Sequence, residues 1–308
     1  MNKAETDQNR LNHMEFELNN LSKISERLKP CSGGLPKLNN IDIYGETIPF
    51  NKIAGGDHIV YVDFNKRYDL DYRIQVAKKK EQDQVVENLV KNKTRAGILL
   101  ADAAGHNTTD VLLTAMLHQA FLTGIYYELK QYGEITNELF EILNTRFFRS
   151  SSLSKFITLL YGEIDELGRF RFLSAGHPLP IVFSNERNTL HRIQKSSITH
   201  FPPIGTLPSR EDIDRTKARS RFGYKKKYQA NEIELMGQGD IMILYTDGFV
   251  DFYNDIEHPY IEERLEKKLA EIKEKPAKEI FQLIKEDMFE FASPGDDLSF
   301  VIVKRMIT

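Results

Sequence analysis

Four short acidic stretches lie far apart in this 308-residue chain, and each stands where a strand would meet a loop. They read Gly-Gly-Asp at 55–57, Ala-Asp-Ala-Ala-Gly-His at 101–106, Tyr-Thr-Asp-Gly at 245–248 and Gly-Asp-Asp at 295–297. Strongly apolar, β-prone runs precede Asp102 and Asp247. Buried strands would therefore bring carboxylates to a common edge of a sheet.

Carboxylates crowded in this way repel one another, and their pKa values rise unless cations neutralise them. Oxygen ligands select Mg²⁺ or Mn²⁺, and the chain offers no histidine pair or cysteine cluster at zinc spacing. Two such ions can activate a water molecule and hold a phosphoryl oxygen during in-line displacement. A single Asp-Gly is usually only a turn, so the prediction depends on the ordered recurrence of these acids.

The order of the motifs carries a resemblance. After Gly-Gly-Asp and Ala-Asp-Ala-Ala-Gly-His come Ser-Ala-Gly-His-Pro at 174–178, Gly-Asp at 239–240 with Leu-Tyr-Thr-Asp-Gly at 244–248, and Asp-Asp-Leu-Ser at 296–299. This succession resembles the SpoIIE-type branch of the metal-dependent protein phosphatases, bacterial relatives of the type 2C serine/threonine phosphatases. The resemblance runs from about residue 35 to 305. It implies an α+β fold in which two stacked antiparallel sheets are flanked by helices, and the strands and helices expected along the chain agree with it.

The resemblance also assigns roles to individual residues. Asp57 would bind one metal ion, and Asp102 would bridge two ions, Mn²⁺ or Mg²⁺. The backbone carbonyl of Ala103 would be a further ligand. Asp247 and Asp296 would bind the second ion.

Three other residues are expected to support the metal ligands. Asp297 would order its loop by hydrogen bonding, although a register slip of one residue would exchange its role with that of Asp296. In the eukaryotic type 2C enzymes, a histidine two residues after the bridging aspartate is a candidate general acid. His106 stands four residues after Asp102, so this role does not transfer to it. A direct catalytic role and a structural role in the loop both stay open for His106. His177 lies in a tight Gly-His-Pro turn, where a structural role is expected.

Composition is consistent with a large single-domain enzyme. The chain is 41% hydrophobic and 28% charged, and its net charge of −3 gives no reason to expect a nucleic-acid partner. The single cysteine, Cys31, excludes an intramolecular disulfide. No apolar run is long enough for a membrane span, and the first residues are polar. We therefore expect no membrane association, no secretory signal and a cytoplasmic location.

Residues 1–30 are expected to form an amphipathic helix ahead of a phosphatase domain at 31–308. Its apolar stripe, which stops before Pro30, consists of Leu11, Met14, Leu18, Leu21 and Leu28. A stripe of this length could be the seam of a homodimer, or it could pack on its own domain. Both interpretations stay open.

Two insertions distinguish the domain from its relatives. Residues from about 65 to 96 are highly charged, but their apolar residues recur at partly helical spacing. We interpret this insertion as a helical elaboration beside the active site or, alternatively, as a solvated surface segment. Residues 208–230 form the most basic run of the chain. Within it Lys225, Lys226 and Lys227 are candidates for contacting an acidic phosphoprotein, and the alternative is a charged loop without a partner.

The remaining elements follow from periodicity. We expect strands at 41–45, 58–62 and 298–303, a core helix at 109–127, a helix at 134–149, a three-strand meander at 156–164, 169–173 and 180–183, and a last helix at 276–291.

The resemblance implies a phosphatase that removes phosphate from phosphoserine or phosphothreonine of a partner protein by attack of a metal-bound hydroxide, without a covalent intermediate. In this family the usual substrate is an anti-anti-sigma-factor-like phosphoprotein in bacterial partner switching. Two alternatives remain. One is a catalytically silent binding module that keeps the fold, and the other is a phosphohydrolase for a small phosphoester.

Overall fold

The computed structural model describes the chain from Lys3 to Ile307, except for residues 29–33, 51–54, 106–109, 151–154, 214, 218, 234 and 235. Two antiparallel sheets of five strands form its centre, in the orders β1-β10-β9-β6-β7 and β2-β3-β4-β5-β8. The strands are β1 (Ile41–Ile48), β2 (Asp57–Asp63), β3 (Arg95–Ala103), β4 (Ile157–Asp165), β5 (Phe170–Ala175), β6 (Ile181–Ser184), β7 (Thr189–Arg192), β8 (Asn231–Ile233), β9 (Ile241–Tyr245) and β10 (Leu298–Arg305).

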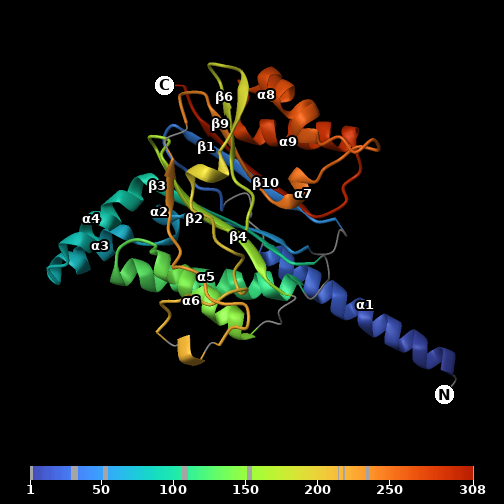
Figure 1. The fold of residues 1–308 in the computed structure, drawn as a ribbon, viewed down its shortest axis with the longest axis horizontal. Coiled ribbons are helices and arrows are strands. Elements are labelled where there is room, and N and C mark those ends of the chain that lie inside the picture. Colours follow the sequence, from blue (N-terminus) through green and yellow to red (C-terminus); the bar gives the residue numbers. More distant parts are fainter. Residues whose placement is uncertain are drawn as a thin grey trace.

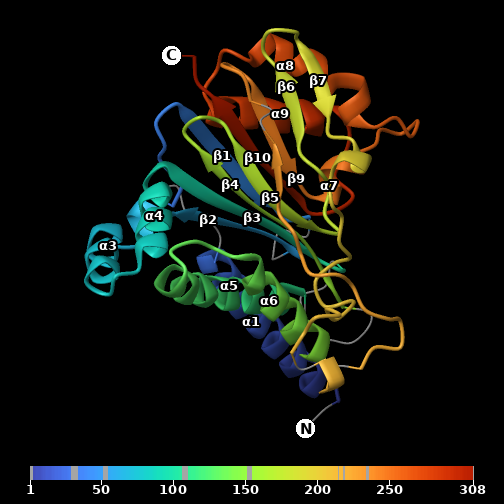
Figure 2. The ribbon, with the colours of Figure 1, turned by 60° about the vertical axis from the view of Figure 1, so that its left-hand side comes forward.

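Helices cover both outer faces of this sandwich (Figure 1). The α-helices are α1 (Lys3–Leu28), α2 (Phe64–Arg67), α3 (Leu70–Lys79), α4 (Asp83–Lys91), α5 (Asp110–Gln131), α6 (Asn137–Ser150), α7 (Asp247–Val250), α8 (Glu266–Ile272) and α9 (Ala277–Phe291). A π-helical segment, Ile261–Leu265, leads into α8. Figure 2 shows α5 and α6 against one sheet and α8 and α9 against the other.

Three apolar cores hold these four layers together. One lies between the sheets, and each of the others joins a sheet to its helices. A strand inside a sheet must therefore bury both faces, which explains why β9 is apolar and buried at every position. β2 is also buried at every position, although it lies at the edge of its sheet. The predicted arrangement, two stacked antiparallel sheets flanked by helices, is confirmed.

The expected meander is wrong in its third strand. β4 and β5 pair as expected, but β6 pairs with β9 and β7 in the other sheet. Gly176, with a positive φ, and the Pro178 turn lead the chain from one sheet to the other. Periodicity within each strand cannot report this change of sheet, because both sheets use the same alternation.

The insertion between β2 and β3 is helical, but it does not lie beside the acidic cluster. Asp57 pairs with Asp102 at one end of the two strands, whereas Asp63 pairs with Ala96 at the other end, where α2, α3 and α4 follow. Seven residues of strand separate the two ends by about 20 Å. The expected position beside the active site is therefore wrong.

α1 extends away from the sandwich (Figure 1) and packs on α5 near the domain. Along it the apolar side chains of Leu11 and Met14 are 55% and 60% exposed, and Leu18 is partly buried. The side chain of Leu21 lies outside the described residues. Leu28 is also partly buried, so the stripe is exposed at Leu11 and Met14 and partly covered at Leu18 and Leu28. Among the described helices, including α1, none combines the length and apolar character that crossing a bilayer needs.

The basic flap, residues 208–230, is fixed to α6 by a buried ion pair. Lys225 is 5% exposed and its Nζ lies 2.9 Å from both carboxylate oxygens of Glu141. The Nζ also lies 3.4 Å from the centre of the Tyr228 ring. Asn144 of α6 binds the root of the flap by donating to the Leu207 carbonyl at 2.8 Å. This contradicts the expected exposure of Lys225 to a substrate, because its charge is used inside the fold.

Candidate metal centre

Two of the predicted ligands face each other across neighbouring strands. Asp57 begins β2, Asp102 lies near the end of β3, and the two residues are register partners. Like charges directly opposite each other destabilise a sheet. The Asp57 carboxylate is partly compensated by the buried Thr246, whose Oγ1 donates to Asp57 Oδ2 at 2.7 Å. Strand pairing therefore places the two carboxylates together at a cost that the fold tolerates.

Burial and mutual repulsion make these carboxylates hard to ionise. Burial raises the pKa of Asp57 well above its usual value, and the neighbouring Asp102 raises it further. Burial, followed by the charges of Asp247 and Asp296, raises the pKa of Asp102 to about 8. Desolvation and then Asp296 also raise the pKa of Asp247. These residues from four separate segments therefore act on one another as a single cluster.

Asp297 orders the loops around the cluster. Its Oδ1 accepts a hydrogen bond from the Phe50 backbone N–H at 2.8 Å, and its Oδ2 accepts one from Gly56 at 2.7 Å. A Cβ at Gly55 would lie 2.1 Å from Asp297 Oδ2, so this approach requires glycine. These contacts occupy both oxygens of Asp297, as expected of a residue that orders the loop.

Asp296 is placed differently from its neighbour. Its Oδ1 accepts a hydrogen bond from the Asp297 N–H at 2.7 Å, and its charge acts on both Asp102 and Asp247. A Cβ at Gly248 would come within 2.0 Å of the Asp297 carbonyl oxygen, so glycine lets α7 approach this loop closely. The charge of Asp297 also acts on Asp102 and on Asp57, so the assignment of Asp296 rather than Asp297 as the ligand stays a prediction.

Of the two candidate histidines, His106 and His177, the structure describes only His177. His106 lies outside the described residues. His177 is buried, and its Nδ1 lies 2.9 Å from Oγ1 of Thr158, the register partner of Asp102 on β4. Burial lowers the pKa of His177 to about 3, so the ring is neutral and cannot supply a proton as an imidazolium near neutrality.

Ala103 and the candidate substrate lysines complete the predicted set. The Ala103 N–H donates to the Gly56 carbonyl at 3.2 Å, so the predicted carbonyl ligand is on the strand end beside Asp57. Lys226 is exposed, and Lys227 lies 3.4 Å from Glu138 on α6. The flap begins near the centre, because Ile204 pairs with Ile157, which in turn pairs with Ala103.

Sequence reasoning missed Lys155. Its Nζ forms an ion pair with the fully buried Asp110 at the start of α5 and donates to the Ala104 carbonyl at 3.2 Å. Lys155 thus connects the loop after Asp102 to the helix that follows it. Its position in the sequence could have indicated this role, because Lys155 comes two residues before β4, the strand that pairs with Ala103.

We expect Lys155→Met to lower Mn²⁺ affinity and turnover by about tenfold, because supports of metal ligands typically contribute that much. It should also lower the free energy of unfolding by about 3 kcal/mol, since the buried Asp110 carboxylate would lose the charge of Lys155. Urea unfolding and an Mn²⁺ titration of activity measure both effects. The control is Lys93→Met, which removes an exposed pair with Asp71. Wild-type stability and Mn²⁺ dependence in Lys155→Met would contradict the positioning role.

The donor set fits a hard divalent cation. In the described part of the chain, no three acidic, histidine or cysteine side chains are close enough to enclose an ion as they stand. However, the clustered donors are carboxylates whose pKa values are raised by burial and by one another, and positive charge would relieve both effects. Asp57, Asp102, Asp247 and Asp296 are therefore the residues that would hold such ions.

Comparison with known proteins places this arrangement in a family. The family model described as Stage II sporulation protein E (SpoIIE) matches residues 92–306, more than half of the chain. The chain belongs to the SpoIIE family. Its match covers β3 to β10 and thus includes three of the four proposed carboxylate ligands.

Among relatives, this SpoIIE-family chain is 28% identical over 158 residues to the phosphoserine phosphatase RsbP of Bacillus subtilis strain 168. The match covers 51% of the chain and 34% of RsbP, so the chain spans about a third of the length of that relative. The SiaA-PP2C domain of Pseudomonas aeruginosa superposes with a TM-score of 0.64 at 15% identity, covering 97% of this chain and 99% of that domain. RsbX in complex with magnesium superposes with a TM-score of 0.52 at 14% identity, covering 88% and 98%. At these identities the two structures establish a shared fold.

Proposed function

We propose that the chain is a Mg²⁺- or Mn²⁺-dependent phosphatase that hydrolyses phosphoserine or phosphothreonine of a partner protein in the cytoplasm. The observation that carries the proposal is the convergence of Asp57, Asp102, Asp247 and Asp296 at neighbouring strand and loop ends. Family membership and the similarity to a phosphoserine phosphatase support the same reaction. The magnesium in the RsbX structure supports the metal.

Each part of the centre has a role in this reaction. Two bound ions would neutralise the carboxylates and supply an activated water for attack on phosphorus. Asp102 would lie between the ions because it is the partner of Asp57 and also feels Asp247 and Asp296. Thr246 orients Asp57 by donating to one of its oxygens, and Asp297 holds the loop that carries Asp296. Since His177 is neutral and bound to Thr158, we assign protonation of the leaving oxygen to water.

A cavity of about 680 Å³ beside Asp247 could receive the substrate. Its walls include the apolar side chains of Tyr245 and Val250 and the polar side chains of Arg192 and His200. This volume exceeds what a phosphoryl group needs and is in the range of ligand pockets. The cavity therefore favours a phosphorylated side chain with its flanking residues over a very small phosphoester.

The basic flap supports a protein partner with acidic character. Lys226 is exposed, and Arg210, Arg219 and Arg221 of the same flap are also exposed. Lys225 is removed from this proposal because it is buried against Glu141. Exposed cations on this flap would raise the encounter rate with an acidic phosphoprotein. An anti-anti-sigma-factor-like phosphoprotein is the partner that the sequence resemblance implies, and we retain it as the proposed substrate.

We also propose that residues 1–30 form a separate segment whose helix α1 mediates self-association. The exposure of Leu11 and Met14 supports this, since a helix packed on its own domain would cover them. Replacing both by Glu should convert a dimer to a monomer in sedimentation velocity, because the seam would bury like charges. Glu replacement of Tyr72, an exposed apolar residue on α3, is the control. A wild-type chain that is monomeric at high micromolar concentration would contradict the proposal.

The function is tested by phosphate release from a phosphoserine protein and from p-nitrophenyl phosphate, each with Mn²⁺, Mg²⁺ or a chelator. We expect metal-dependent release from both, with a higher kcat/KM for the protein. Preference for the small ester would replace the proposed substrate class. No release from either substrate, with saturable binding of the phosphoprotein, would identify a silent binding module.

A further inference from the structure

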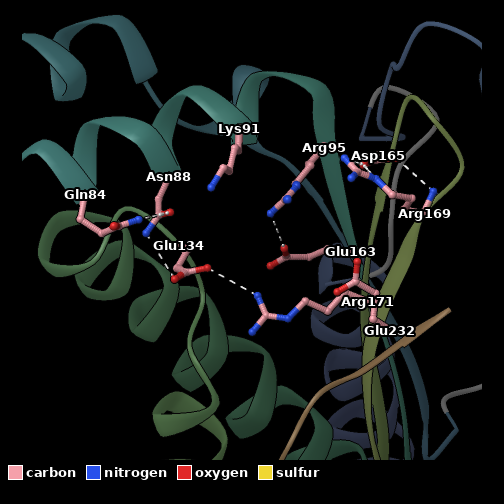
Figure 3. A pocket seen from close by; sticks show the side chains of 10 residues that line it. All are labelled: Gln84, Asn88, Lys91, Arg95, Glu134, Glu163, Asp165, Arg169, Arg171 and Glu232. Atoms are coloured by element: carbon pink, nitrogen blue, oxygen red, sulfur yellow. Dashed lines mark hydrogen bonds and ion pairs between the residues drawn. The ribbon is translucent and has the colours of Figure 1, made fainter. Parts of the chain in front are cut away.

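A second polar cavity, of about 330 Å³, lies at the opposite end of the same sheet from the carboxylates. It is formed where α4 and the turn after α5 face strands β3, β4 and β5 (Figure 3). Arg95 begins β3 and Asp102 lies seven residues further along it, so about 23 Å of strand separates the cavity from the metal centre. The cavity is therefore a different site from the one described above.

Cationic side chains from three elements surround this cavity. Lys91 extends from α4, Arg95 from β3 and Arg171 from β5, and Figure 3 shows them around a common space. Two carboxylates hold the arginines loosely: Arg95 lies 3.6 Å from Glu163, and Arg171 lies 3.4 Å from Glu134. A guanidinium has five N–H donors, and one long ion pair leaves most of this capacity for a ligand.

The Glu163 carboxylate compensates the arginines less than its formal charge suggests. Glu163 is 6% exposed and accepts a hydrogen bond from the Tyr161 hydroxyl at 3.0 Å. Burial raises the pKa of Glu163, which reduces its ability to compensate the arginines. Glu134 remains at the rim, where it accepts a hydrogen bond from Asn88 at 3.2 Å. The lining holds four cationic side chains, Lys91, Arg95, Arg169 and Arg171, and four carboxylates, Glu134, Glu163, Asp165 and Glu232. Arg169 and Asp165 pair closely at 2.7 Å, so the long pairs of Arg95 and Arg171 leave the donors, and Glu134 the acceptor, that a ligand could use.

The frame around the cavity is already ordered. Asn88 donates to the Tyr132 carbonyl at 2.9 Å, and Asn92 donates to the Gly133 carbonyl at 2.8 Å. These bonds fix α4 to the turn that carries Glu134. The cations on α4 and on the sheet are therefore held at a set separation, which lowers the entropic cost of binding.

We propose that this cavity binds a small organic phosphate that also carries hydroxyl groups, such as a sugar phosphate. Lys91, Arg95 and Arg171 bind the phosphate, and Glu134 accepts a hydrogen bond from a hydroxyl of the ligand. The volume is at the lower end of ligand pockets and suits a ligand of this size. Arginine suits this role because its planar fork donates two parallel hydrogen bonds to phosphate oxygens.

The experiment is isothermal titration of the full chain with ribose 5-phosphate, compared with ribose and with malonate. We expect saturable binding of ribose 5-phosphate that weakens at least about tenfold in Arg171→Gln and in Lys91→Gln, because each loses a charged hydrogen bond. Lys91 is exposed and pairs with Glu87 at 2.6 Å on the surface of α4, so its variant tests the site without disturbing the core. The matched control is Arg264→Gln, which removes a partly exposed pair with Asp287 on the other side of the sandwich.

The Asp102→Asn variant distinguishes binding in this cavity from binding at the metal centre. The proposal expects ribose 5-phosphate binding to persist in Asp102→Asn. Binding that disappears in Asp102→Asn but persists in Arg171→Gln and Lys91→Gln would place the ligand at the metal centre and overturn the proposal. No saturable binding of ribose 5-phosphate would also overturn it. Malonate binding as tightly as ribose 5-phosphate would overturn the assignment to phosphate.

Discussion

Asp102→Asn should lower metal-dependent turnover by at least about a hundredfold while the protein stays folded. Asp102 is the register partner of Asp57 and also interacts electrostatically with Asp247 and Asp296. An amide keeps the shape of the side chain but removes the negative charge between the two proposed ions. The measurement is phosphate release from the phosphoserine protein across an Mn²⁺ titration.

The matched control for this variant is Asp240→Asn. Asp240 is also a buried aspartate, but its carboxylate accepts hydrogen bonds from Asn185 at 2.8 Å and Gly237 at 2.7 Å in a turn before β9. Its replacement should cost stability without changing Mn²⁺ dependence. Near wild-type turnover in Asp102→Asn, or an equal loss in Asp240→Asn, would remove Asp102 from its proposed position between the ions.

The sequence predicted the convergence of the acids better than it predicted the path of the chain around them. The acids could be found because each follows or precedes a buried strand, and strand pairing is a local consequence of alternation. Asp57 and Asp102 illustrate this, since their two strands pair so that the acids become direct partners. The sequence could not decide between Asp296 and Asp297 as the ligand. The two adjacent acids differ in the backbone N–H groups that they contact, and the groups that Asp297 contacts belong to distant loops.

The errors have a common physical cause. The transfer of β6 to the other sheet, the position of α3 and α4 far from the acids, and the burial of Lys225 all depend on contacts between distant segments. Lys225 shows this most clearly. Its neighbours Lys226 and Arg221 are exposed, but Lys225 meets Glu141 of α6 and the Tyr228 ring. Charge patterning along the chain cannot distinguish one lysine of such a run from the next.

The chelated protein should become less stable as the pH rises from about 4 to about 8. The pKa of Asp102 is raised from 3.8 to about 8 in the folded chain, so folding favours its protonated form. The stabilisation is therefore fully present below the unfolded pKa and is lost as the pH rises through the folded pKa. Its size should be on the order of 4 kcal/mol, after discounting for partial exposure and for coupling to the other acids. Asp57 and Asp247, whose pKa values are also raised, add to this slope.

Metal should reverse this trend, because ionised carboxylates bind the cations and the binding free energy adds to stability. Urea unfolding at pH 5, 6.5 and 8, with chelator or with Mn²⁺, measures both effects. Asp102→Asn cannot titrate at this position, so in chelator its stability should fall less with pH, and at pH 8 it should equal or exceed that of the wild type. If the stability of the two proteins in chelator depended on pH in the same way, burial and the neighbouring charges would not raise the pKa of Asp102. The electrostatic argument for a cation between these acids would then lose its basis.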